Sequence, residues 1–233
     1  MFWLDQRRSL DSGGIVFKRV LWVSIFSLCV FPAWASSVSL FPTSILAPAG
    51  EKAAVVTLVN DGETPERFQV TVLDWALDAD GQDVTSPTKA LLAAPSIVEI
   101  PPGSRRAVRL VRTQGVGTPG YYRVLLRQLP QPATPGRVQL LIHQNLPLAF
   151  EDAHAGPPLL TARFTPDGLL LTNTGPTAAR MTAIGPQGQP AWREGALGWV
   201  LPGQSKHVGL KPGQKAASIT VTVNGASIPL VAD

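Results

Sequence analysis

Cysteine is almost absent from this chain of 233 residues, in which Cys29 is the only one. It lies in an apolar run, 20–33, that follows two basic residues and ends at Ala33-Trp34-Ala35. Such a run is typical of a cleaved export signal, here residues 1–35, with the mature chain beginning at Ser36. Removal of this leader excludes disulfides and thiolate metal sites from the mature protein, and export without cysteine fits a bacterial periplasm.

A membrane-spanning apolar run is also missing. The run at 20–33 falls short of the roughly 20 residues that a spanning helix needs, so we expect no stable membrane insertion. A lipid anchor on Cys29 is disfavoured because Leu28 stands where lipoprotein signals have a small residue. Four of the 20 basic residues and two of the 16 acidic ones lie in the leader, which leaves the mature chain with a net charge of +2. So small a charge on an exported protein argues against a nucleic-acid partner.

Motifs for catalysis and metal binding are missing too. The three histidines stand at spacings that match no metal-ligand motif, and Gly203-Gln204-Ser205-Lys206 lacks the second glycine of a nucleophile elbow. The aspartates around Gly81 resemble a calcium loop, but no bidentate glutamate follows at the required spacing, and Asp80-Gly81 fits a hairpin turn better. The sequence therefore predicts a protein that is not an enzyme and holds no cofactor or metal.

What the chain does contain is a series of short runs with strand character, and no segment has a convincing helical period. Turn formers such as Asn60-Asp61-Gly62 and Pro101-Pro102-Gly103 separate the runs. In the first part of the chain the predicted strands are 38–46, 53–60, 68–75, 96–100, 107–112, 121–129 and 137–150. About seven strands at this spacing indicate an immunoglobulin-like sandwich.

A polar break at 151–158 precedes a second block of the same kind. Its predicted strands are 159–164, 169–173, 181–184, 199–201, 207–210, 218–223 and 227–231. Asn224-Gly225, between the last two, is the strongest hairpin signal in the chain because both central positions of a type I′ turn need positive φ. The sequence thus predicts an all-β chain of two immunoglobulin-like sandwiches, 36–153 and 154–233, the second one short.

The run 137–150 is long for a strand of a globular protein, which typically has three to ten residues. Its apolar residues alternate with the others and the alternation fails only at Gln144; they are Val138, Leu140, Ile142, Leu146, Leu148 and Phe150. Part of so long a strand is expected to serve something besides the core of its own domain, which points to strand donation. The alternative is that all of these side chains pack into their own core.

Several motifs of the first domain occur in a distinctive order. They are Val38-Ser39-Leu40, 42–52, 58–62, Asp74-Trp75, Pro101-Pro102-Gly103, 122–126 and Leu129-Pro130. This ordered set resembles the PapD-like periplasmic pilus chaperones over nearly all of the first domain. The Leu-Pro-Leu at 146–148 is closer to the spore coat U-type, or archaic, members. In the second domain the resemblance is thinner and rests on 169–176 and Leu201-Pro202-Gly203.

The resemblance implies two sandwiches set at an angle and an assembly function. Such chaperones capture pilin or spore coat U-like subunits, whose immunoglobulin fold lacks its last strand, and deliver them to an outer-membrane usher. The chaperone's last first-domain strand fills the gap, with alternate side chains in the subunit's groove and main-chain hydrogen bonds completing the ladder. By register, the donor side chains here would be Val138, Leu140 and Ile142.

The basic pair that grips the subunit's terminal carboxylate in conventional members is missing here. Matching the motifs places Ser44 and Pro147 at the two positions, and neither carries a charge. Between Glu99 and Glu151 the chain has no acidic residue but seven arginines, and the planar guanidinium suits bidentate carboxylate binding. We therefore expect one of these to act as the anchor, and the candidates are Arg123 first, then Arg109, Arg112 and Arg127. The alternative is a solvated strand surface that blocks edge aggregation.

Two functions from different classes remain open. The first is a periplasmic chaperone for pilus or spore coat U-like subunits, favoured by the alternation of Val138, Leu140 and Ile142. The second is a non-catalytic secreted β-sandwich that acts as an adaptor or structural binding protein, favoured by the loss of both anchor charges.

Overall fold

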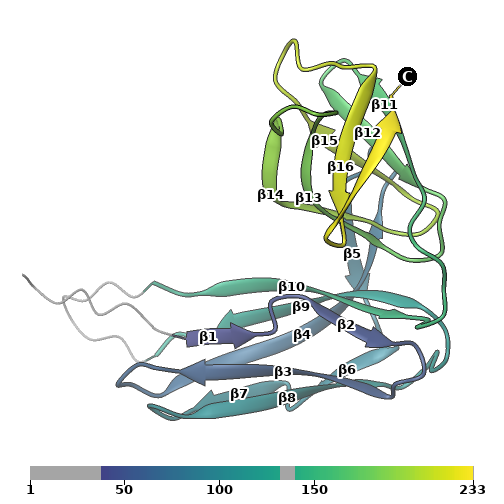
Figure 1. Cartoon of the computed structure of the whole chain (residues 1–233). Helices are drawn as coiled ribbons and strands as arrows, with labels where there is room; N and C mark the ends of the chain where they lie inside the picture. Colours follow the sequence, from purple (N-terminus) through teal and green to yellow (C-terminus); the bar gives the residue numbers. More distant parts are fainter. Residues whose placement is uncertain (1–37, 132–139, 233) are drawn as a thin grey trace, which may run out of the picture. The chain divides into compact units, whose positions relative to one another are not determined.

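Every regular element in the described part of the chain, residues 38–131 and 140–232 of this computed structural model, is a β-strand (Figure 1). The strands of the first half are β1 (Val38–Phe41), β2 (Ile45–Pro48), β3 (Ala53–Asn60), β4 (Glu66–Leu77), β5 (Asp83–Pro87), β6 (Leu91–Ala94), β7 (Ile97–Ile100), β8 (Arg105–Arg112), β9 (Gly120–Gln128) and β10 (His143–Glu151). Those of the second half are β11 (Leu160–Thr165), β12 (Gly168–Asn173), β13 (Ala179–Pro186), β14 (Arg193–Val200), β15 (Ser205–Gly209), β16 (Ser218–Val223) and β17 (Ala226–Val231). No helix among these residues is long and apolar enough to span a membrane.

The first half forms a sandwich of two sheets. One sheet has the strand order β1-β3-β8-β6, and the other has the order β2-β10-β9-β4-β5, with β7 also paired to β4. All neighbours are antiparallel except β10 and β2, which run parallel. Because β1 pairs with β3 and β2 pairs with β10, the chain crosses from one sheet to the other between Phe41 and Ile45. This arrangement confirms the predicted immunoglobulin-like sandwich.

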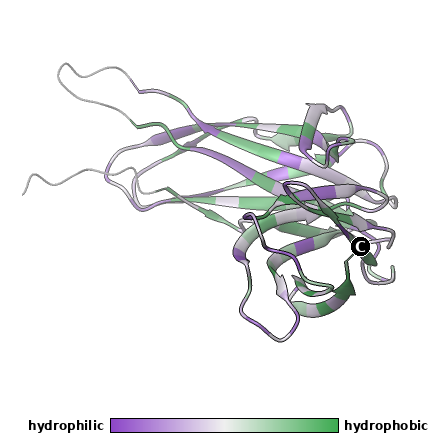
Figure 2. Cartoon of the chain, turned by 90° about the horizontal axis from the view of Figure 1, so that it is seen from above, coloured by the Kyte–Doolittle hydropathy of each residue, from purple (hydrophilic) through white to green (hydrophobic). Residues whose placement is uncertain are grey.

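Alternation of side chains builds the core of this sandwich. Along β4 every second residue from Glu66 to Val72 is buried, and the residues between them are exposed. Figure 2 shows the resulting changes from hydrophilic to hydrophobic colour along the strands. The side chains that point inward from both sheets, such as Leu58, Phe68, Leu110 and Phe150, form one apolar cluster. A half-buried sheet of this kind is what period-two patterning predicts.

The second half forms a smaller sandwich with the sheets β11-β12-β15 and β14-β13-β16-β17. Its apolar cluster includes Leu169, Met181 and Val221, which are fully buried. Trp75 and Ala149, from β4 and β10, are buried in the same cluster. Single side chains near the C-terminal ends of these two first-half strands therefore contribute to the second core, while Leu148 and Phe150 of β10 pack in the first.

Two turns follow the sequence closely. Asn224 and Gly225 both have positive φ, 51° and 87°, and connect β16 to β17 as predicted for a type I′ hairpin. Between β4 and β5, Asp78 Oδ1 accepts hydrogen bonds from the N–H groups of Asp80 and Gln82 at 3.0 and 2.8 Å. Gly81 there has a φ of 73°, so this segment is the predicted hairpin turn.

Three predicted strands differ from the structure, and two strands were not predicted. The predicted strand 38–46 is two strands, since the chain changes sheet around Pro42, and the predicted strand 137–150 begins at His143 within the described residues. β5 and β6 were not predicted, because β5 is exposed at every residue and β6 has only four. β14 covers Arg193–Val200 rather than 199–201, because its first four residues are exposed and lack apolar alternation.

Candidate functional site

Strand β10 has one edge that is only partly covered. It pairs with β9 along its length from His143 to Phe150, but β2 pairs only with its last four residues, Leu148–Glu151. Among the described strands nothing pairs with the outer edge of residues 143–147. An uncovered edge presents N–H and C=O groups that another strand can bind.

The even-numbered residues of the predicted strand 137–150 are mostly apolar and are called here the apolar parity. The structure divides them into two groups. Leu146, Leu148 and Phe150 are 4%, 0% and 0% exposed and pack in the first core. Leu140, on the same parity, is 82% exposed. Ile142 is half-buried, and Val138 lies outside the described residues. The alternation in the sequence therefore serves the domain's own core only at its C-terminal end, within the part that is described.

Backbone directions show which residues face the uncovered edge. Ile142 directs its carbonyl to β9, where it accepts from the Gln128 N–H at 2.9 Å. Since backbone groups alternate in direction along a strand, those of His143, Asn145 and Pro147 face away from β9. Pro147 has no N–H, so its place on the uncovered edge costs the sheet no hydrogen bond.

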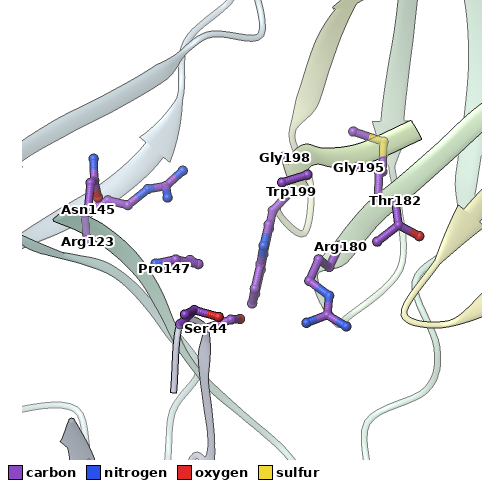
Figure 3. Close-up of a pocket in the computed structure, with 12 residues that line it drawn as sticks. Ser44, Arg123, Asn145, Pro147, Arg180, Thr182, Gly195, Gly198 and Trp199 are labelled. Atoms are coloured by element: carbon purple, nitrogen blue, oxygen red, sulfur yellow. The ribbon is translucent and has the colours of Figure 1, made fainter. Parts of the chain in front are cut away.

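Ser44 and Pro147, the two residues at the conventional anchor positions, line one cavity of about 710 Å³. Arg123 and Asn145 lie on the same side, and Arg180 and Trp199, from β13 and β14, contribute another wall (Figure 3). The remaining lining residues are Thr43, Met181, Thr182, Gly195, Ala196 and Gly198. The structure thus brings the two conventional anchor positions, Ser44 and Pro147, together, with Arg123 and Arg180 beside them.

Arg123, the first predicted anchor, is already engaged within the protein. Its guanidinium lies over the Trp75 ring, 3.8 Å from the centroid, and its Nη2 is 3.2 Å from Asp83 Oδ2. Asp83 also binds Lys206 Nζ, at 3.2 Å. Burial lowers the pKa of Arg123, and the neighbouring Asp83 acts in the opposite direction. The side chain is only 12% exposed, and Asp83 is its acidic partner in the free protein.

The other three predicted arginines do not line this cavity. Arg112 is buried: it donates to the carbonyls of Ala49 and Thr118, each at 2.8 Å, and stacks on Phe150. These contacts give it a structural role in holding the segment after β8. Arg109 and Arg127 are exposed on β8 and β9, which fits the alternative of a solvated strand surface.

Arg180 is the cavity residue that sequence reasoning missed. Its backbone exchanges hydrogen bonds with Asn224, whereas its exposed side chain makes no ion pair in the part of the chain that the structure describes. It lies outside the acid-free segment, and nothing in the linear sequence relates it to Ser44 or Pro147. Only the fold could have identified it.

Comparison with known proteins decides the family. The family model for "Pili and flagellar-assembly chaperone, PapD N-terminal domain" matches residues 37–152. The chain belongs to the PapD-like pilus assembly chaperones. The family resemblance inferred from the motifs is therefore confirmed. Members of this family are chaperones for pilin subunits and not enzymes, and they are periplasmic.

Solved structures of other pilus chaperones share the fold. A chaperone–subunit complex from the archaic Csu pili of Acinetobacter baumannii, CsuC–CsuE, matches with a TM-score of 0.70 at 20% identity, covering 85% of this chaperone and 100% of that chain. The Salmonella enterica SafA–SafB complex gives 0.65 at 20% identity, covering 84% and 97%. The E. coli chaperone DraB gives 0.60 at 16% identity, covering 85% and 96%. No curated protein matches the sequence.

Proposed function

We propose that this protein captures pilin or spore coat U-like subunits in the periplasm by donor-strand complementation and delivers them to an outer-membrane usher. The observation that carries the proposal is the 82% exposure of Leu140, on the parity whose later members are fully buried. Leu140 and Ile142 fill the subunit's groove, together with Val138 outside the described residues. A leucine exposed to this extent in the free protein is available to a partner at little cost to its own fold.

The uncovered edge of β10 supplies the main-chain part of the interaction. The backbone groups of Ile142 point toward β9, so by alternation the backbone groups of His143 and Asn145 point toward this edge. A subunit strand that pairs there completes a ladder, while the apolar parity fills the groove. Burying three side chains of this size contributes about 5–8 kcal/mol before the costs of association.

The subunit's terminal carboxylate is proposed to bind in the cavity beside Ser44 and Pro147. Of the four arginines nominated from the sequence, Arg123 alone lines this cavity. The Arg123 guanidinium is already paired with Asp83, whereas the Arg180 guanidinium lines the same cavity and makes no ion pair among the described residues. We place the carboxylate between them, with Arg180 as the new ligand and Arg123 as a fixed cation. The exposed Arg109 and Arg127 serve as controls, and the buried Arg112 keeps its structural role.

The proposed export signal is residues 1–35, with a mature start at Ser36, and both lie outside the described residues. Cleavage of such a leader on export agrees with capture of subunits in the periplasm.

A non-catalytic adaptor is the second candidate, favoured by the uncharged Ser44 and Pro147 at the anchor positions. One experiment separates the two. A tagged chain is purified from periplasmic extract of its native host, and bound proteins are identified by mass spectrometry. A chaperone retains a small secreted subunit in a one-to-one ratio to itself and loses it when Leu140 is changed to Glu. An adaptor retains a partner that this variant also binds, and absence of any partner contradicts both functions. Genes for an usher and small secreted proteins beside the chaperone gene would agree with the first result.

A further inference from the structure

Gln128, the last residue of β9, has an unusual position for a polar side chain. It is 3% exposed, and Glu66 beside it is 6% exposed. Strands β9 and β10 pair in regular register from Gly120 to Arg127, with Arg127 opposite His143. One step further, this register places Gln128 opposite Ile142, the last residue of the proposed donor segment and the one directly before β10.

Both backbone groups of Ile142 are bound by Gln128, but in different ways. The Gln128 N–H donates to the Ile142 carbonyl at 2.9 Å. The Ile142 N–H donates to the side-chain Oε1 of Gln128 at 2.8 Å. In a regular antiparallel pair the second bond would also go to a backbone carbonyl. A side chain therefore takes the place of the main chain where β10 begins.

Glu66 fixes which way the Gln128 amide points. Gln128 Nε2 donates to Glu66 Oε2 at 2.6 Å, a short bond to a buried acidic residue. Turning the amide over would set its oxygen against the carboxylate and its NH2 against the Ile142 N–H. The carboxylate thus keeps Oε1 directed at Ile142.

Among the described residues, the pairing of β9 with the segment that leads into β10 ends at this point. Leu129, which follows Gln128, donates its N–H to Arg67 of β4 at 2.8 Å, and two residues before Ile142 the Leu140 side chain is 82% exposed. The segment after β9 and the segment before β10 therefore separate directly beyond the Gln128–Ile142 contact. Where they part decides which residues belong to the protein's own sheet and which are offered to a partner.

We propose that Gln128, oriented by Glu66, is a positioning residue that sets the exit point and register of the donor segment; this rests on the donor-strand function proposed above. By holding Ile142 at both backbone groups, it keeps the apolar parity in phase with the buried Leu146 and Leu148. A slip of one residue would turn Leu140 and Ile142 to the opposite face.

The test uses three variants of the full mature chain. Gln128→Met keeps the size and removes the side-chain bonds to Glu66 and Ile142, and Gln128→Glu sets two carboxyl groups against each other. The swap Glu66→Gln with Gln128→Glu restores a donor for one carboxylate oxygen and leaves the other for the Ile142 N–H. Gln69→Met, an exposed glutamine on β4, is the matched control. Hydrogen exchange of the Ile142 amide is measured by NMR, with circular dichroism to check folding.

In both single Gln128 variants we expect the Ile142 amide to exchange about tenfold faster or more, with wild-type rates in the swap and the control. Retention of the co-purifying subunit should fall in the two single Gln128 variants and return to the wild-type level in the swap and the control. Wild-type exchange in Gln128→Met, or a swap no better than Gln128→Glu, would overturn the positioning role. Failure of the wild-type protein to retain any subunit would contradict the proposed function alone, because the exchange measurement needs no partner.

Discussion

Replacing Leu140 by Glu perturbs the proposed donor segment with the least disturbance to the chaperone itself. The side chain is 82% exposed in the free protein and lies before the first residue of β10. Exposed positions of this kind usually change stability by less than about 0.5 kcal/mol when substituted. We therefore expect the variant to fold as the wild type does.

In the complex the same substitution should be severe. Most of the leucine surface is exposed beforehand, so its burial by the subunit is worth about 1–2.5 kcal/mol of the full 1.5–3 kcal/mol. A glutamate with an ordinary pKa near 4.3 costs about 3.7 kcal/mol to neutralise at pH 7 before it enters an apolar groove. The combined loss of about 5–6 kcal/mol corresponds to a Kd raised at least a thousandfold.

The assay compares Leu140→Glu with Leu141→Glu in the same pull-down. Leu141 is the adjacent residue of the opposite parity and is 41% exposed, so its side chain should point away from the subunit's groove. We expect loss of the subunit with the first variant and retention with the second, at equal circular dichroism. Equal retention by both would refute donation by this parity. An unfolded Leu140→Glu would assign Leu140 to the protein's own core.

Three further predictions concern the N-terminal end of the mature chain and two arginines. Intact mass spectrometry of the exported protein should show a mature chain beginning at Ser36, and a lipidated species or a retained leader would contradict this. Arg180→Ala should weaken subunit binding by about 2–5 kcal/mol, mainly through faster dissociation measured by surface plasmon resonance, and Arg180→Lys should recover little of it. A mild effect equal to that of Arg127→Ala would exclude Arg180 as the anchor. Arg112→Ala should lower the free energy of unfolding in urea by about 2–4 kcal/mol, since it leaves the buried Ala49 carbonyl and the part-buried Thr118 carbonyl without this donor, and an unchanged midpoint would refute its structural role.

The sequence was sufficient for most of the fold because period-two alternation and turn chemistry are local. Asn224-Gly225 specifies its hairpin through two residues that tolerate positive φ. β5 could not be found in the same way, because all five of its residues are exposed, and its pairing with β4 and the ion pairs of Asp83 appear only in the folded chain. The alternation at 137–150 was visible, but which of its residues enter the protein's own core depends on the partner sheet and not on the run itself.

The site was less accessible from the sequence than the fold. Charge patterning nominated Arg112, yet it carries no information on burial, and this guanidinium is inside the domain. Arg180 was missed because it is brought to Ser44 and Pro147 only by folding. Gln128 gave no signal either, since a lone glutamine at a strand end is ordinary until its partners Glu66 and Ile142 are known.

Site-specific photo-crosslinking tests donor-strand capture most directly. Benzoylphenylalanine is placed at Leu140 in one chaperone and at Val55, an exposed residue of β3, in another. After irradiation in the periplasm, mass spectrometry identifies the linked peptides. We predict an adduct from position 140 to core-facing residues of a pilus subunit and none from position 55. A complex that forms without any adduct at position 140 would contradict the account.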